Sequence, residues 1–289
     1  MLAQRLITGP LLIAALLGLV WMDGWVASQG NPGGLVFLAI FAFLLIPLAA
    51  GEAASLLQQS GLRAPRGTAV FLSWCLLGGA CAAQFLEPSR STLALALLGP
   101  AVVFGLAMLS AAWGRRIEGA WVSASGLMGI AIWTGLLPAF WVLATQNHSA
   151  WLVAGLILVV KMGDIGAYFT GMSIGKHKLI PWLSPGKTIE GLIGALVFGG
   201  LAGLGLSLLS QSAADPQNQL CMAAGVIGGV ALAFLGAMGD LVESLLKRTA
   251  GAKDSGTLLP GMGGILDVLD SPLATGPAAY LVLLWGTAG

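Results

Sequence analysis

The chain has 289 residues, of which 57% are hydrophobic and only 9% are charged. Soluble domains carry about 25% charged residues, so this composition excludes a soluble globule, and the shortage of charge excludes a disordered chain. The net charge of +1 offers no clustered basic surface, so nucleic acid is not an expected partner. The composition is that of a polytopic integral membrane protein.

Nine stretches of the chain are long and apolar enough to cross a bilayer, which takes about 20 residues in a helix. Lipid leaves backbone groups no water to bind, so each stretch is expected to be helical and the fold class to be all-α. The expected spans lie near residues 5–23, 33–51, 67–86, 91–113, 119–145, 149–173, 189–211, 218–240 and 272–288. Glycines gather in the seventh and eighth spans, where small residues let membrane helices pack closely.

Residues 1–145 carry about five of these helices, and residues 146–289 form a C-terminal catalytic region with two polar loops, 174–188 and 241–271. Most basic residues fall in alternate connections that share one side of the membrane: Arg5, Arg63, Arg66, Arg115, Arg116, Lys176, Lys178, Lys187, Lys247, Arg248 and Lys253. Cytoplasmic connections carry the excess of Lys and Arg. We therefore expect a multi-pass protein of the cell inner membrane or cytoplasmic membrane, with the N-terminus and both loops in the cytoplasm.

The C-terminal region also holds most of the polar residues that are unusual in a membrane protein. Lys161 and Asp164 interrupt an apolar span on one helical face, where they form either an internal ion pair or part of a functional site. In the first half of the chain, Glu52 is the one acid at the expected cytoplasmic face that stands beside an apolar run. The functional residues are therefore expected in the C-terminal region.

A polar stripe continues out of the eighth span. Its members recur at helical spacing, which an interfacial amphipathic helix would also show: Asp240, Glu243, Ser244 and Lys247. A glycine-rich turn at residues 260–264 can then present backbone N–H groups to an anion, and Asp267 and Asp270 beyond it can share a divalent cation. Acids for a hard metal beside lysines for phosphates are typical of phosphoryl or nucleotidyl transfer.

The segment that ends in Gly186, Lys187 and Thr188 superficially looks like a phosphate-binding P-loop. That pattern requires a glycine at position 181, where this chain has proline, and a strand before the loop, which the sequence does not predict. The segment therefore does not match a P-loop. The segment instead predicts a proline-constrained turn that delivers Lys187 and Thr188 to the start of the seventh span.

Three ordered blocks between residues 161 and 271 resemble those of the phosphatidate cytidylyltransferases, also called CDP-diacylglycerol synthases. The first block combines Asp164-x-Gly166-Ala167-Tyr168 with Lys187-Thr188-x-Glu190-Gly191. The second is Gly239-Asp240-x-x-Glu243-Ser244-x-x-Lys247-Arg248, and the third is Pro260-Gly261-Met262-Gly263-Gly264-Ile265-Leu266-Asp267-Val268-Leu269-Asp270-Ser271. Met262 and Val268 depart from the family's pattern, in which a histidine and an arginine are usual.

The resemblance implies transfer of CMP from CTP to phosphatidic acid, giving CDP-diacylglycerol and pyrophosphate in phospholipid biosynthesis. It implies Mg²⁺ as cofactor, leaves open a second, monovalent or divalent, cation, and makes a homodimer an expectation from the family alone. Metal ligands are expected at Asp240, Asp267 and Asp270, and catalytic roles at Asp164, Lys187, Glu243, Lys247 and Asp267. Substrate contacts are expected at Lys176, Ser184, Lys187, Thr188, Lys247, Arg248, Lys253, Gly263 and Gly264.

Two alternatives compete with this interpretation. One is another membrane transferase or kinase that joins a nucleotide to a different lipid. The other is a secondary transporter, whose charged sites lie near the middle of the membrane in two related repeats. Here the charged residues gather toward one face and in one half of the chain, which favours an enzyme.

Overall fold

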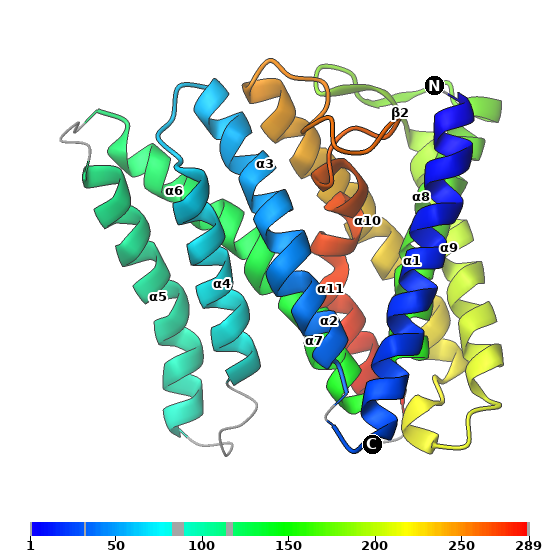
Figure 1. Ribbon diagram of the computed structural model, residues 1–289. Coiled ribbons are helices and arrows are strands. Elements are labelled where there is room, and N and C mark those ends of the chain that lie inside the picture. The colour runs from blue at the N-terminus through cyan, green and yellow to red at the C-terminus, as the bar shows by residue number, and fades with distance from the viewer. Residues whose placement is uncertain (1, 32, 83–89, 114–117, 288–289) are drawn as a thin grey trace. The chain divides into compact units, whose positions relative to one another are not determined.

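The computed structural model describes residues 2–31, 33–82, 90–113 and 118–287, and it is predominantly helical (Figure 1). The helices, in chain order, are α1 (Leu2–Ser28), α2 (Leu35–Ile40), the π-helical η1 (Phe41–Leu45), α3 (Ile46–Gln59), α4 (Arg66–Ala82), α5 (Arg90–Ala112), α6 (Ala120–Ala131), the π-helical η3 (Ile132–Leu136), α7 (Leu137–Asn147), α8 (Ala150–Ile174), α9 (Ile189–Ser210), the 3₁₀ turn η4 (Pro216–Asn218), α10 (Met222–Thr249) and α11 (Leu266–Gly286). Two strands, β1 (Lys178–Ile180) and β2 (Ser184–Thr188), form an antiparallel hairpin between α8 and α9.

Seven helical stretches within the described residues are long and apolar enough to cross a membrane. They are Pro10–Ser28, Leu35–Gln59, Ala120–Asn147, Ala150–Ile174, Ile189–Ser210, Met222–Thr249 and Leu266–Gly286. Two shorter apolar helices, Arg66–Ala82 and Gly99–Ala112, lie where the third and fourth spans are predicted. The structure is thus that of a polytopic helical membrane protein, and the count of nine spans stays a prediction. Arg115 and Arg116, on which the predicted orientation partly depends, lie outside the described residues.

The predicted loop at residues 241–271 is too long at both ends. Helix α10 continues to Thr249 and α11 begins at Leu266, so Asp267 and Asp270 lie in a helix. Hydropathy marks only the part of a helix that is apolar, and here the polar stripe extends α10 beyond it. Pro272, which looks like a helix start, lies inside α11. The β hairpin is also absent from the sequence prediction, because its strands are only three and five residues long.

The chain divides into two compact units, and the predicted division into regions at residue 145 stays a prediction. The first comprises Met1–Leu38, Phe140–Leu245 and Asp270–Gly289, and the second comprises Ala39–Ala139 and Leu246–Leu269. Within the first unit, the hairpin and the start of α1 lie at one end, and the connection between α9 and α10 lies at the other (Figure 1).

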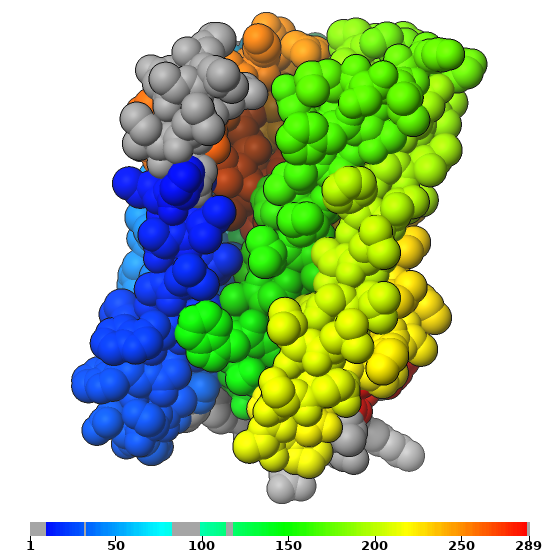
Figure 2. Space-filling view, turned by 90° about the vertical axis from the view of Figure 1, so that its right-hand side faces the viewer, coloured from blue at the N-terminus to red at the C-terminus, as the bar shows by residue number. Residues whose placement is uncertain are grey.

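Glycines bring the helices of the first unit into close contact. Helices α8 and α9 pack side by side along their length (Figure 2). Helix α10 packs against α9 as well: a Cβ built on Gly199 would lie 2.6 Å from the carbonyl oxygen of Gly229 on α10, and Gly203 contacts Gly225 in the same way. The predicted close packing of the two glycine-rich spans is confirmed. Lipid provides little hydrophobic drive for helix association, so this backbone contact is a main source of stability.

In the second unit, α4 is the central helix and packs against α3, α5 and α6. Ser73 of α4 lies 2.9 Å from Thr134 of η3, oxygen to oxygen, and both side chains are buried. Gly135 lacks the Cβ that would collide with the backbone of Ser73. A small residue and a polar pair thus join α4 to the π-helical segment η3.

Candidate active site

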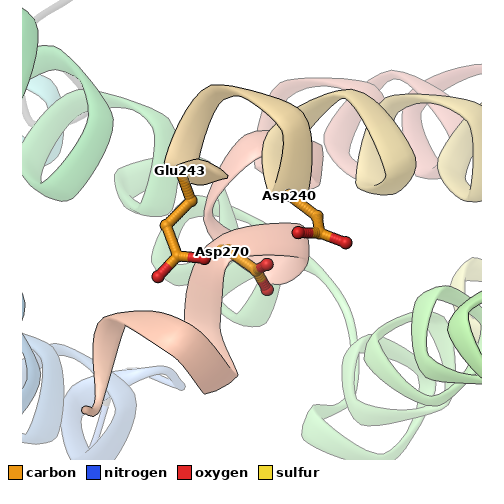
Figure 3. Close-up of side chains that lie close together, drawn as sticks. All are labelled: Asp240, Glu243 and Asp270. Carbon is orange, nitrogen blue, oxygen red and sulfur yellow. The ribbon is translucent and has the colours of Figure 1, made fainter. Parts of the chain in front are cut away.

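Three carboxylates of the first unit converge where α10 meets α11. Asp240 and Glu243 are one turn apart on α10, and Asp270 lies on α11 (Figure 3). One oxygen from each lies within 4.8 Å of the other two. Glu243 is 1% exposed and Asp270 is 6% exposed, whereas Asp240 is half-buried. We call these three residues the acid cluster.

Gly239 explains why the acid cluster forms. A Cβ at this position would lie 2.7 Å from the carbonyl oxygen of Asp270 and 2.7 Å from the Cβ of Ala274. Only a glycine therefore lets α11 approach α10 at the level of Asp270. The residue that follows Gly239 is Asp240, so the close approach and the acidic side chain come from adjacent positions.

The acid cluster has the chemistry of a divalent cation site. Two like unit charges about 5 Å apart repel each other by about 3 kcal/mol at an effective dielectric constant of about 20. A hard cation such as Mg²⁺ removes this repulsion, because it takes oxygen ligands at about 2.0–2.1 Å, which places opposite ligands about 4 Å apart. The spacing of the three carboxylates fits such an ion after small side-chain movements.

Lys187 reaches the acid cluster from the β hairpin. Its Nζ lies 2.9 Å from Oδ2 of Asp240 and donates to the carbonyl oxygen of Ala237 at 3.3 Å. Ser244 adds a hydroxyl 3.5 Å from Oδ1 of Asp240. The predicted turn that delivers Lys187 is therefore a strand, and its lysine provides a positive charge beside the acids.

The hairpin is held in place at the N-terminus of α9. Thr188 caps this helix, its Oγ1 accepting a hydrogen bond from the N–H of Gly191 at 3.1 Å. Glu190, in the first turn of α9, accepts hydrogen bonds from the backbone N–H groups of Lys176 and His177 and contacts Nδ1 of His177 at 2.6 Å. These contacts fix both ends of the hairpin, so Lys187 is presented by a rigid element.

Asp164 takes part in a separate contact within the first unit. Its Oδ2 pairs with Lys161 at 3.0 Å, which is one of the two alternatives that the sequence leaves open, and its Oδ1 accepts a hydrogen bond from the Ser271 hydroxyl at 3.3 Å. Ser271 directly follows Asp270, so the ion pair of α8 is linked to the part of α11 that carries the acid cluster.

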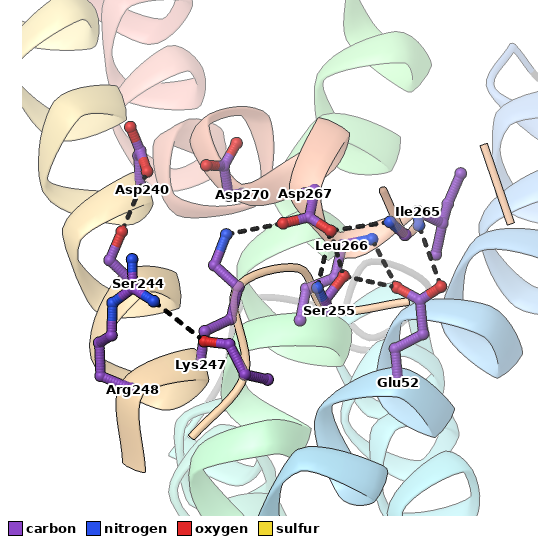
Figure 4. Close-up of polar contacts among 12 residues, drawn as sticks. Glu52, Asp240, Ser244, Lys247, Arg248, Ser255, Ile265, Leu266, Asp267 and Asp270 are labelled. Carbon is purple, nitrogen blue, oxygen red and sulfur yellow. Dashed lines mark hydrogen bonds and ion pairs between the residues drawn. The ribbon is translucent and has the colours of Figure 1, made fainter. Parts of the chain in front are cut away.

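Asp267 belongs to a different group of contacts, in the second unit (Figure 4). Its Oδ1 pairs with Nζ of Lys247 at 2.6 Å. Its Oδ2 accepts hydrogen bonds from the N–H of Ser255 at 2.8 Å and from the N–H of Gly264 at 2.7 Å, and the Ser255 hydroxyl lies 2.8 Å away. The side chains of Lys247 and Asp267 are 12% and 8% exposed. Both oxygens of Asp267 are thus bound to donors of the protein.

The glycine-rich turn supports the same contacts. Gly263 has a φ of +97°, which favours glycine, and a Cβ there would lie 2.5 Å from Oδ2 of Asp267. The N–H of Gly263 donates to the carbonyl oxygen of Leu259, and the N–H of Gly264 donates to Asp267. The two amides expected to bind phosphate therefore have partners inside the protein.

The remaining predicted substrate residues lie on exposed or half-buried parts of the two units. Lys176 and Lys253 are exposed, and Ser184 is half-buried in β2. Arg248 is exposed and its Nη1 donates to the carbonyl oxygen of Ala252 at 3.2 Å. The side chains of Lys176, Arg248 and Lys253 are therefore accessible to a ligand in solution.

Sequence reasoning gave no role to Glu52. This residue of α3 accepts hydrogen bonds from the N–H groups of Ile265 and Leu266 at the start of α11, and from the Ser255 hydroxyl. The signal that could have identified it is its placement, as an acid that stands beside an apolar run at the expected cytoplasmic face.

Comparison with known proteins identifies the family of this chain. The sequence matches the cytidylyltransferase family over residues 3–285. A phosphatidate cytidylyltransferase of Pseudomonas aeruginosa is 34% identical over 293 residues, covering 99% of this chain and 97% of that protein. Phosphatidate cytidylyltransferases of Mycobacterium bovis and Staphylococcus saprophyticus are 35% and 39% identical, over 55% and 48% of this chain and 50% and 52% of those proteins. The chain is therefore a member of the cytidylyltransferase family.

Proposed function

We propose that this protein transfers CMP from CTP to phosphatidic acid. A phosphate oxygen of the lipid attacks the α-phosphorus of CTP, the bond to the β-phosphate breaks, and pyrophosphate leaves as CDP-diacylglycerol forms. The observation that carries the proposal is the acid cluster, in a helical membrane protein whose relatives are named for this reaction. The lipid phosphate is already ionised near neutral pH, so the protein needs no strong general base.

Asp240, Glu243 and Asp270 are the residues that would hold Mg²⁺. When bound, the ion would neutralise the triphosphate and stabilise the charge that develops on the leaving pyrophosphate. Lys187 orients Asp240 and offers a positive charge to the phosphates, and Asp164 supports the neighbouring part of α11. The sequence also predicts Asp267 as a ligand, which requires its carboxylate to exchange Lys247 or Ser255 for the cation.

Other predicted residues take more distant roles in this proposal. Lys176, Arg248 and Lys253 provide exposed positive charges for the triphosphate, with Ser184 as a hydroxyl partner. Thr188 acts through its cap on α9, and Gly263 and Gly264 act by shaping the turn that holds Asp267. A second cation and a homodimer remain predictions from the family alone.

Incubation of purified protein with labelled CTP, phosphatidic acid and Mg²⁺ tests the reaction. We expect label in the lipid extract and release of one pyrophosphate for each labelled lipid. ATP in place of CTP, and a polyprenyl phosphate in place of phosphatidic acid, should each give no labelled lipid. Transfer to the polyprenyl compound alone would favour the other membrane transferases or kinases, and the absence of any transfer would contradict the proposal.

We also propose that the protein lies in the inner or cytoplasmic membrane with this site facing the cytoplasm. Gly186 in the hairpin is exposed with open space around it, so Gly186→Cys adds a thiol without a clash. The native Cys221, which is also exposed, lies in the connection at the other end of the first unit and is a matched control. A thiol reagent that cannot cross the inner membrane should label Cys221 in intact cells, and the cysteine at position 186 only after lysis. The reverse pattern would overturn the orientation.

A further inference from the structure

Glu52 holds the start of α11 from a helix more than 200 residues earlier in the chain (Figure 4). Its Oε1 accepts a hydrogen bond from the N–H of Ile265 at 3.1 Å, and its Oε2 accepts one from the N–H of Leu266 at 2.9 Å. The first N–H groups of a helix have no partner within the helix, and a carboxylate also suits the positive end of the helix dipole. Glu52 thus serves as the N-terminal cap of α11.

The same carboxylate also holds the loop that precedes α11. The Ser255 hydroxyl lies 3.0 Å from Oε2 of Glu52 and 2.8 Å from Oδ2 of Asp267. One hydroxyl proton serves only one carboxylate at a time, but the short distances to both fix the position of Ser255. Glu52 is therefore linked through Ser255 to Asp267, and through Asp267 to Lys247.

Glycines let the backbone of this loop pack closely against the Glu52 carboxylate, which together with Ser255 and Gly256 also lines a cavity of about 380 Å³. A Cβ on Gly256 would lie 2.6 Å from Oε1 of Glu52, and a Cβ on Gly264 would collide with Oε2 and with the Ser255 hydroxyl. Two glycines thus let the backbone close around one carboxylate. This close packing of the loop goes beyond what the capping of a helix alone requires.

We propose that Glu52 is a positioning residue of the active site, which sets the loop at residues 250–265 and the Lys247–Asp267 pair for the nucleotide. The inference rests on the proposed function, since it assigns this loop to CTP. In this role Glu52 is not itself a substrate contact. It acts by fixing backbone and side chains that the family resemblance assigns to phosphates.

The test compares Glu52→Gln and Glu52→Asp with Asp23→Asn. Glutamine keeps the size of the side chain but places an NH₂ group against backbone donors, whereas aspartate keeps both acceptors on a shorter stem. Asp23 is a matched control, because its buried carboxylate also accepts two backbone hydrogen bonds, from Gly34 and Val36 at 3.0 Å, but it contacts no predicted site residue among those described. All three variants should lose some thermal stability.

If Glu52 positions the site, the three variants should differ in their KM for CTP. For Glu52→Gln we expect the KM for CTP to rise about tenfold, with the KM for phosphatidic acid within about twofold of wild type. Glu52→Asp should recover part of the loss, and Asp23→Asn should leave both KM values unchanged. Should Glu52→Gln fail to fold, Glu52→Asp and Ser255→Ala provide the same comparison. Equal KM values for CTP in all variants, or an equal rise in Asp23→Asn, would overturn the proposal.

Hydrogen exchange of residues 250–267 in the same proteins separates this inference from the proposed function. We expect faster exchange of this segment in Glu52→Gln than in wild type or Asp23→Asn, with no lipid present. Unchanged exchange would refute the positioning role whatever the reaction is. Failure of the proposed function looks different, because wild type itself then forms no CDP-diacylglycerol.

Discussion

The acid cluster and the contacts around Asp267 are both rich in carboxylates, but they differ in what those carboxylates bind. In the cluster, oxygens of Asp240, Glu243 and Asp270 lie within 4.8 Å of one another. Around Asp267, both oxygens accept hydrogen bonds from Lys247 or from backbone and hydroxyl donors. The first arrangement brings three carboxylates together beside Lys187 and gains from an added cation, whereas in the second Lys247 and neighbouring donors bind both oxygens of one carboxylate. Acidic residues close together in sequence thus need not share one role.

The strongest test of this difference is the removal of one charge from the acid cluster. Asp270→Asn keeps the shape of the side chain but weakens the site for a cation, so turnover should fall about 100- to 1,000-fold and half-saturation by Mg²⁺ should move to higher concentration. Thermal stability in the presence of a chelator should not fall, because one of the repelling carboxylates is gone.

The control for this variant is Asp215→Asn, which alters an exposed acid that caps the 3₁₀ turn η4. It should retain wild-type turnover and Mg²⁺ dependence. Near-normal turnover of Asp270→Asn at saturating Mg²⁺ would remove Asp270 from the proposed ligands, and a large loss of stability would mean that Asp270 serves the fold.

Asp267→Asn should instead lower the stability of the protein and leave its Mg²⁺ requirement unchanged. Its partner Lys247 would be left with a buried, uncompensated charge, so the protein should lose about 2–3 kcal/mol of unfolding free energy. The concentration of Mg²⁺ that gives half-maximal activity should change little. Adding Lys247→Met to this variant should restore part of the stability, since the unpaired charge is then removed.

If Asp267→Asn has an unchanged melting temperature and a raised requirement for Mg²⁺, the distinction between the acid cluster and the contacts of Asp267 is wrong. Asp267 would then be a metal ligand, as its spacing to Asp270 predicts, and its contacts with Lys247 and Ser255 would be those of the cation-free protein. Melting curves and Mg²⁺ titrations of the Asp267→Asn and Asp270→Asn variants, run side by side, decide between the two roles.

The sequence predicts those parts of the site that depend on local spacing. Asp240 and Glu243 are three residues apart on one helix, so their common face follows from helical periodicity. The closeness of the α9 and α10 backbones likewise follows from their glycines. The two acids are close in sequence, and the glycines are small residues, which in membrane helices serve close packing.

Other features depend on contacts that no local pattern contains. Asp270 joins the acid cluster only because Gly239 lets two helices approach, and Glu52 caps a helix that starts far along the chain. Asp267 looks like a ligand from its spacing, but its oxygens face Lys247 and the Ser255 segment. Spacing along a helix says which residues share a face, not which donors the fold brings to them.

A smaller effect is expected from Lys187, which places a positive charge beside the three carboxylates of the acid cluster. Lys187→Met should raise the KM for CTP about tenfold, the loss expected for one charge-assisted contact. Lys187→Arg should keep part of the activity, and Lys178→Met, in the neighbouring strand, should behave as wild type because Lys178 is exposed. Equal effects of Lys187→Met and Lys178→Met would mean that the hairpin contributes only general positive charge.

The smallest expected effect comes from Val268, which is half-buried in the first turn of α11 directly after Asp267. An arginine is usual at this position in the family, so Val268→Arg adds a guanidinium where this chain has an apolar side chain. A charge-assisted hydrogen bond contributes about 1.5–3 kcal/mol, from which the cost of partly burying the guanidinium must be subtracted. We expect the KM for CTP to fall by about two- to tenfold in consequence.

Met262→His is the matched comparison for Val268→Arg. A neutral imidazole adds one donor and no fixed charge, so its effect on the KM for CTP should be smaller. Loss of activity in Val268→Arg without loss of folding would mean that the added cation competes with Lys247 for Asp267. In that case the arginine usual in the family requires a set of contacts around Asp267 that this chain does not provide. A rise in activity would instead show that the contacts of Asp267 tolerate a cation at position 268. The difference between the acid cluster and the contacts of Asp267 would then not depend on an apolar residue in this turn of α11.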